Sequence, residues 1–150
     1  MSYEQLQLEN QLCFPFYAVS RLIIRAYQED LDQLGITYPQ YLVLMVLWEN
    51  DLQTVNEIGE RLILNTNTIT PLLKRMETME LLERKQSVTD QRKVIVSLTE
   101  KGMNLKEQAA GIPHRLMKKM NMEPTELKIE ELIALKNQLN DLIKLLKEVR

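Results

Sequence analysis

Apolar and polar residues alternate with a period of three to four positions over most of the chain. This period is typical of α-helices that bury one face, and the sequence contains only four glycines. The pattern predicts a first helical region over roughly residues 4–34. Gly35 is expected to end it, because glycine readily adopts the left-handed conformation found at helix ends. We therefore expect a mainly α-helical chain.

A second helix is predicted to begin after Thr37. Thr37 and Gln40 have the spacing of a capping box, and Pro39 is tolerated in the first turn of a helix. The segment YLVLMVLWEN, which begins at Tyr41, is apolar on nearly every side. This helix should therefore be central and buried.

Two further helices are joined by the turn signal LNTN. Thr54 and Glu57 form a second capping-box pattern before VNEIGERL. Gly59 inside that short helix costs about 1 kcal/mol relative to alanine, which indicates that another helix crosses close to it. The next helix, TITPLLKRMETMELL, has an apolar face made of Ile69, Leu72, Leu73, Met76 and Met79.

The period then changes to two. In RKVIVSL, the residues Val94, Val96 and Leu98 alternate with their neighbours, which is typical of a β-strand. LLERKQS supplies a partner strand, and VTDQ supplies the turn of a hairpin. Helical sequence resumes at Thr99 and continues with breaks near Pro113 and Pro124.

Two helices, a tight turn and a hairpin in this order predict a winged helix-turn-helix over about residues 37–98. The predicted fold class is mainly α with a small β-hairpin wing. In such a fold the second helix enters the major groove of double-stranded DNA, and the hairpin meets phosphates or the minor groove. The expected DNA-binding residues are Asn65, Thr66, Asn67, Thr68, Thr70, Lys74, Arg75, Arg84, Lys85, Asp90, Arg92 and Lys93.

Charge gives this prediction modest support. The whole chain has a net charge of −2, whereas residues 72–93 contain six basic and four acidic residues, a local excess of two positive charges. Arg84, Lys85, Arg92 and Lys93 are expected at the hairpin tip, with Asp90 orienting arginine side chains. A solvated helix face would have a similar charge, so the order of the elements carries the prediction.

The C-terminal segment predicts a homodimer. Its apolar residues follow alternating steps of three and four, the spacing of a coiled-coil seam, and packing within one subunit is the alternative. Two-fold DNA readers also need a dimer to place two half-sites about 34–36 Å apart. We therefore assign helices over about 4–34 and 100–148 to dimerisation, within a single domain of residues 1–150. The seam residues are Leu132, Leu135, Leu139, Leu142, Leu146 and Val149.

Composition narrows the class of protein further. The 150 residues are 45% hydrophobic and 27% charged, which is ordinary for one globular domain. One cysteine cannot form an internal disulfide, which favours the cytoplasm. We find neither a signal peptide nor an apolar run long enough to span a bilayer. His114 is the only histidine, so we expect no metal site, no cofactor and no enzyme activity.

Cys13 lies among aromatic residues in LENQLCFPFYA. Pro15 fits best in a first helical turn, which would place Cys13 near a helix N-terminus, where the partial positive charge favours a thiolate. Tyr17, one turn later, can donate its O–H to the sulfur. A thiolate attacks a peroxide and becomes a sulfenic acid, and Phe14 and Phe16 favour an organic peroxide. A buried, inert cysteine is the alternative.

Over nearly its full length the sequence resembles the MarR family of winged helix-turn-helix regulators. The resemblance is carried by GITYPQYLVLMVLWEN, IGERLILNTNTITPLLKRME and DQRKVIVSLTEKG. LENQLCFPFYA, with Cys13, Tyr17 and Tyr27, most resembles the one-cysteine branch that senses organic hydroperoxides. The resemblance implies that these three residues form a redox sensor, in which two tyrosines, one from each subunit, hydrogen-bond to the sulfur.

The same resemblance implies a repressor that binds operator DNA as a homodimer while Cys13 is reduced. Oxidation alone, or a mixed disulfide between Cys13 and a small-molecule thiol, would break the contacts to tyrosine and release the DNA. Asn65, Thr66 and Asn67 depart from the branch, which commonly has an acidic residue, a serine and a glycine there. The operator sequence is therefore not implied by the resemblance.

Three other functions are open at this stage. A MarR-type regulator could be released by a small aromatic or anionic ligand, with Cys13 incidental. A thiol peroxidase would use Cys13 catalytically, but its winged helix would then be unexplained. A helical dimer that binds only proteins would fail to bind DNA in its reduced state.

Overall fold

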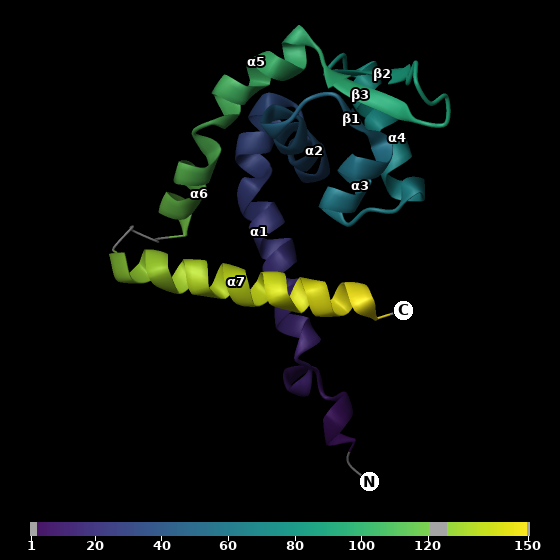
Figure 1. The fold of residues 1–150 in the computed structure, drawn as a ribbon. Coiled ribbons are helices and arrows are strands. Elements are labelled where there is room, and N and C mark those ends of the chain that lie inside the picture. The colour runs from purple at the N-terminus through teal and green to yellow at the C-terminus, as the bar shows by residue number, and fades with distance from the viewer. Residues whose placement is uncertain (1–2, 121–125, 150) are drawn as a thin grey trace. The chain divides into compact units, whose positions relative to one another are not determined.

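The computed structural model describes residues 3–120 and 126–149. They form two compact units, of which one ends at Ile112 and the other begins at Pro113. Within the described ranges, no helix is long and apolar enough to cross a membrane. The elements in chain order are two 3₁₀ turns (Glu4–Leu6 and Leu8–Asn10), α1 (Cys13–Leu34), α2 (Tyr38–Glu49), β1 (Gln53–Thr54), α3 (Val55–Leu62), α4 (Thr66–Thr78), β2 (Leu82–Gln86), β3 (Val94–Leu98), α5 (Glu100–Ala109), α6 (Ile112–Lys119) and α7 (Glu126–Glu148) (Figure 1).

Helix α1 begins at Cys13 rather than near residue 4, and the two 3₁₀ turns precede it. A helix that continued through Pro15 would need a main-chain N–H that proline lacks, and the ring would clash with the carbonyl of Gln11. With its start at Cys13, α1 places Pro15 in the first turn, where N–H groups have no helical acceptor. Gly35 follows the helix with a φ of +67°, as predicted.

Helix α2 is the buried centre of the first unit, which confirms its prediction. The main-chain N–H of Thr37 donates a hydrogen bond to Gln40 Oε1 at 2.8 Å and fixes the start of the helix. Each fully buried aliphatic side chain in such a core contributes about 2 kcal/mol. The core around α2 contains Leu31, Tyr41, Val43, Leu44, Leu47, Ile58, Ile69, Leu73, Met76 and Val96.

Helices α3 and α4 form the predicted helix-turn-helix. The Glu57 carboxylate accepts a hydrogen bond from the Thr54 N–H at 2.7 Å, and Thr54 Oγ1 accepts from the Glu57 N–H at 3.2 Å. A Cβ atom on Gly59 would lie 2.9 Å from the Leu64 carbonyl oxygen and 3.5 Å from Ile69 Cγ2 of α4. Glycine therefore permits the predicted close approach of the two helices.

The predicted hairpin is present, but its sheet has a third strand that the sequence did not predict. Strands β2 and β3 pair antiparallel with Arg84 opposite Val96, and β1 pairs with the other edge of β3. The strand order is β1-β3-β2. Strand β1 contains only Gln53 and Thr54, too few residues to show a period of two.

Helix α5 begins at the predicted cap, where Thr99 Oγ1 accepts a hydrogen bond from the Gly102 N–H at 3.1 Å. The predicted break near Pro113 lies between α5, which ends at Ala109, and α6, which begins at Ile112. Pro113 is the second residue of α6, a position suited to proline. His114 is exposed on α6. The break predicted near Pro124 lies outside the described residues.

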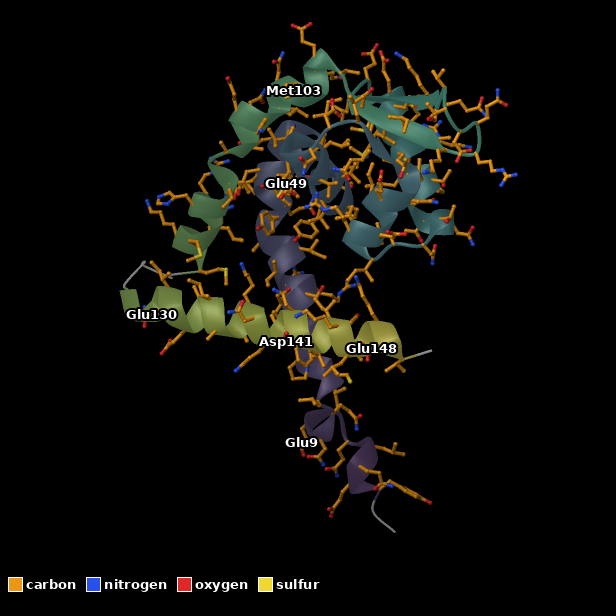
Figure 2. The ribbon with its side chains drawn as sticks, in the orientation of Figure 1. Glu9, Glu49, Met103, Glu130, Asp141 and Glu148 are labelled. Carbon is orange, nitrogen blue, oxygen red and sulfur yellow. The ribbon has the colours of Figure 1, made fainter. Side chains whose placement is uncertain are left out.

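Helix α7 carries the apolar stripe that predicted a dimer seam. In a single copy of the chain, Leu135 is 50% exposed and Leu146 is 60% exposed. Acidic side chains also lie along this helix, among them Glu130 and Asp141 (Figure 2), and Lys144 Nζ donates to Asp141 Oδ1 at 3.0 Å. The stripe is thus exposed at Leu135 and Leu146 and half-buried at Leu132 and Leu142.

Candidate DNA interface and thiol site

The N-terminal end of α4 is fixed by two residues predicted to bind DNA. Asn65 Oδ1 accepts hydrogen bonds from the main-chain N–H and from the hydroxyl of Thr68, both at 3.1 Å. This contact is an N-cap, which satisfies a main-chain donor at the helix start. Asn65 and Thr68 therefore hold the end of the helix through contacts with each other.

The outer face of α4 remains available for contact with a partner. Thr66, Asn67, Lys74 and Arg75 are exposed, and Thr70 is half-buried. These side chains offer hydroxyl, amide and cationic groups on one helix, and an α-helix has the width that the major groove admits. Together with Thr68, which also belongs to α4, six of the predicted DNA-binding residues lie on this one helix.

The loop between β2 and β3 is ordered by hydrogen bonds to its main chain. The Ser87 N–H donates to the Lys93 carbonyl oxygen at 2.9 Å, and Asp90 Oδ1 accepts from the main-chain N–H of Arg92 at 3.1 Å. Asp90 thus orders the loop backbone at Arg92, and its expected contact with arginine side chains stays a prediction. The side chains of Arg92 and Lys93 are exposed at this tip.

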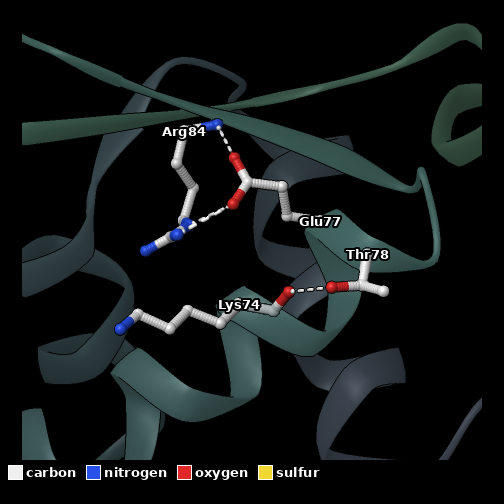
Figure 3. Close-up of polar contacts among 4 residues, drawn as sticks. All are labelled: Lys74, Glu77, Thr78 and Arg84. Atoms are coloured by element: carbon white, nitrogen blue, oxygen red, sulfur yellow. Dashed lines mark hydrogen bonds and ion pairs between the residues drawn. The ribbon is translucent and has the colours of Figure 1, made fainter.

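Arg84 and Lys85 lie within β2, not at the hairpin tip where the sequence placed them. The guanidinium of Arg84 donates to Glu77 Oε2 through Nε at 3.0 Å and Nη2 at 2.8 Å (Figure 3). These side-chain hydrogen bonds lower the pKa of the Glu77 carboxyl. Lys85 pairs with Glu83, which raises the pKa of the lysine. Both basic side chains are therefore engaged by neighbouring carboxylates.

Cys13 is the first residue of α1, and its side chain is exposed in the single chain. Tyr17 follows by one helical turn and therefore lies on the same face. Its ring centroid is 6.4 Å from that of Phe14, and the guanidinium carbon of Arg21 lies 5.6 Å from the Tyr17 centroid. The structure thus confirms the predicted position of Cys13 at a helix N-terminus with Tyr17 beside it.

Tyr27 belongs to a different part of the unit. Its ring centroid lies 5.0 Å from that of Tyr38 and 6.0 Å from that of Tyr41. Burial raises the pKa of the Tyr27 phenol, and the two neighbouring phenols add to the effect. Fourteen helical residues separate Tyr27 from Cys13, about 21 Å at the usual rise. Tyr27 therefore cannot reach the thiol of its own chain.

The aromatic cluster around Tyr27 was missed by the sequence analysis. It continues from Tyr41 to Trp48, whose ring centroids are 6.2 Å apart, and Trp48 Nε1 donates to the Gly102 carbonyl oxygen of α5 at 2.9 Å. The available signal was the placement of Tyr38, Tyr41 and Trp48 at helical intervals along α2. The cluster joins α1, α2 and α5 into one packed block.

The helix-turn-helix, the three-stranded sheet and the lone thiol on α1 define a winged helix-turn-helix protein with a candidate redox site. Residues 25–109 match a protein family described as transcriptional regulator SarA/Rot. The organic hydroperoxide resistance transcriptional regulator of Bacillus subtilis is 50% identical over 115 residues, which are 77% of this chain and 78% of that protein. The chain belongs to the MarR/SarA family of winged-helix transcriptional regulators.

Solved structures agree with this assignment. Reduced AbfR bound to DNA is 40% identical with a TM-score of 0.78, over 99% of this chain and 100% of that chain. Overoxidized AbfR bound to DNA is 40% identical with a TM-score of 0.72, over 95% and 99%. AbfR is a Staphylococcus epidermidis protein. The relatives are transcriptional regulators, so the predicted family and fold class are confirmed and the enzyme alternative loses support.

Proposed function

We propose that this transcriptional regulator is a repressor that leaves its operator when an organic hydroperoxide oxidises Cys13. The observation that carries the proposal is the position of Cys13 at the start of α1, one turn from Tyr17. The proposal is supported by 50% identity to a regulator of organic hydroperoxide resistance. If a small ligand released the regulator from DNA instead, the placement of Cys13 next to Tyr17 would have no role.

In this oxidation the sulfur of Cys13 gives two electrons to the peroxide. The Cys13 thiolate attacks one peroxide oxygen, the S–O bond forms as the O–O bond breaks, and the alkoxide leaves and takes up a proton. A small-molecule thiol then attacks the sulfenic acid, forms a mixed disulfide and releases water. Because AbfR is bound to DNA in its overoxidized form, we propose the bulkier disulfide as the species that releases DNA.

The DNA contacts in this proposal divide between two elements. Thr66, Asn67, Thr70, Lys74 and Arg75 on the outer face of α4 meet base edges and phosphates in the major groove. The loop cations Arg92 and Lys93 meet phosphates or the minor groove. Asn65 and Thr68 position the end of the helix. The support is the exposure of these side chains and the DNA-bound state of reduced AbfR.

The proposal also requires a homodimer. The exposed apolar stripe of α7 supplies a surface that a second copy of the chain can bury. We propose that α1 and the C-terminal helices form the dimer interface, and that residues 37–98 form the DNA-binding lobe. Since Tyr27 cannot reach the thiol of its own chain, the partner subunit's Tyr27 contacts Cys13. A cytoplasmic location follows from the chromosomal target.

The decisive experiment measures DNA binding before and after oxidation. A duplex is selected from random sequences with the reduced protein, and fluorescence anisotropy then follows its binding as an organic hydroperoxide and a small-molecule thiol are added. Reduced wild type should bind and then release the duplex, whereas Cys13→Ser should bind without release, since an alcohol cannot form a sulfenic acid. Release of Cys13→Ser at the wild-type dose would contradict the proposal.

A further inference from the structure

We propose that Glu77 and Arg84 form a clamp that fixes the wing at a set angle to helix α4. In this role Arg84 is a positioning residue, which supports DNA binding without contacting DNA. The inference rests on the proposed function, because it assumes that α4 and the wing bind one duplex together. It differs from the prediction made from sequence, in which Arg84 contacts DNA directly.

Three hydrogen bonds define the clamp (Figure 3). Glu77 lies in the last turn of α4 and Arg84 in the middle of β2. Glu77 Oε1 accepts the main-chain N–H of Arg84 at 3.0 Å, and Oε2 accepts Nε at 3.0 Å and Nη2 at 2.8 Å. One carboxylate therefore holds both the backbone and the side chain of a residue in the wing. The Arg84 side chain is only 20% exposed.

The clamp joins two elements that must meet DNA at different places. A short turn connects α4 to β2, and Glu80 within it has a φ of +59°. Two bonds from the start of α5 hold the backbone of this turn, since Thr99 Oγ1 donates to the Glu80 carbonyl oxygen and Lys101 Nζ donates to that of Met79. Neither bond reaches β2. The planar guanidinium of Arg84, bound to Glu77, holds β2 at one angle to α4.

The two possible roles of Arg84 predict opposite changes in DNA affinity when the charge of Glu77 is removed. If Arg84 contacted phosphate, the negative charge of Glu77 would weaken DNA binding, and its neutralisation would strengthen it. If Glu77 positions the wing, its neutralisation weakens binding despite the loss of a negative charge. The sign of the change in affinity therefore separates the two roles.

The test compares four variants on two duplexes, one selected with reduced wild-type protein and one of random sequence. We expect Glu77→Gln and Arg84→Lys each to weaken binding to the selected duplex about tenfold, because a hydrogen bond to a charged group is lost. The double variant should be no weaker than either single variant, because both break one contact. Glu83→Gln, which neutralises an exposed acid on the same strand, is the matched control and should bind as tightly as wild type or more tightly.

Hydroxyl-radical footprinting supplies a readout that a general loss of stability does not produce. The clamp variants should lose protection where the wing lies and keep protection where α4 enters the major groove, while thermal unfolding shows that they remain folded at the assay temperature. Tighter or unchanged binding by Glu77→Gln, or wild-type binding by Arg84→Lys, would overturn the clamp. Failure of reduced wild type to select any duplex would instead overturn the proposed function.

Discussion

Tyr17 and Tyr27 lie on the same helix in different surroundings. Tyr17 is 58% exposed and sits beside the guanidinium of Arg21, whereas Tyr27 packs against Tyr38 and Tyr41. Burial raises the pKa of the Tyr27 phenol, because it disfavours the charged phenolate. The packing of Tyr27 thus couples the ionisation of its phenol to the folded state.

Tyr27→Phe should reduce the loss of stability at alkaline pH. The folded-state pKa of Tyr27 is raised above its ordinary value of 10.0, so its contribution to folding is present below about pH 10 and is lost as pH rises through the folded value. Urea unfolding at about pH 9 and about pH 11 measures the free energy of unfolding for each protein. The exposed Tyr3→Phe serves as the control. Equal losses in wild type and Tyr27→Phe would contradict this assignment.

The contacts that could be predicted from the sequence join residues only a few positions apart. Thr37 with Gln40, and Thr54 with Glu57, are found as capping pairs because a helix start fixes both members locally. The partner of Arg84 was not predicted, because seven residues and a change from helix to strand separate it from Glu77. Such contacts depend on how elements fold back onto each other, which local patterns do not record.

At the scale of elements, α4 separates residues that hold the helix from residues that face outward. Asn65→Ala should lower the free energy of unfolding by about 1 kcal/mol, because it removes the N-cap. Asn67→Ala should leave stability nearly unchanged, because Asn67 is exposed in the first turn, and should alter the sequence preference. Chemical denaturation and selection from random duplexes measure the two effects. The same consensus from wild type and Asn67→Ala would remove Asn67 from base recognition.

The wing is predicted to bind DNA through charge at its tip. Arg92→Glu should weaken binding to selected and random duplexes alike and lower the slope of log affinity against log salt by about one for each lost phosphate contact. Lys118→Glu, an equal change of charge at an exposed position on α6, is the control, and size-exclusion chromatography checks that it is still a dimer. Salt titrations followed by anisotropy give both slopes. An unchanged slope in Arg92→Glu would place the wing away from DNA.

Helices and strands long enough to repeat their apolar pattern several times were predicted correctly. The errors, at β1 and at the start of α1, have physical causes. Helices α2 to α5 and the hairpin follow their predicted patterns. Strand β1 has two residues and no measurable period, and it forms because β3 offers it an edge. The start of α1 was placed too early because apolar spacing continues upstream of Cys13, whereas the helix begins at that residue.

At the scale of the whole molecule, mixed dimers test the contact between subunits. A Cys13→Ser subunit keeps Tyr27, and a Tyr27→Phe subunit keeps Cys13, so their heterodimer retains one complete site only if the contact crosses the interface. We expect such heterodimers to release DNA faster than Tyr27→Phe homodimers when an organic hydroperoxide and a small-molecule thiol are added. Subunits with two different tags allow the heterodimer to be purified and assayed by anisotropy. Release at the homodimer rate would show that Tyr27 does not act across the interface.

The length of α1 between Cys13 and Tyr27 has a statistical consequence. If each thiol is read by a tyrosine of the other chain, every dimer holds two reporting contacts, and the loss of either one disturbs both subunits. When thiols react independently, the fraction of dimers with both contacts intact is the square of the reduced fraction. At half oxidation, about one dimer in four keeps both contacts. If the loss of one contact releases the dimer, DNA release would run ahead of Cys13 oxidation, with about three quarters of the dimers altered when half of the thiols have reacted.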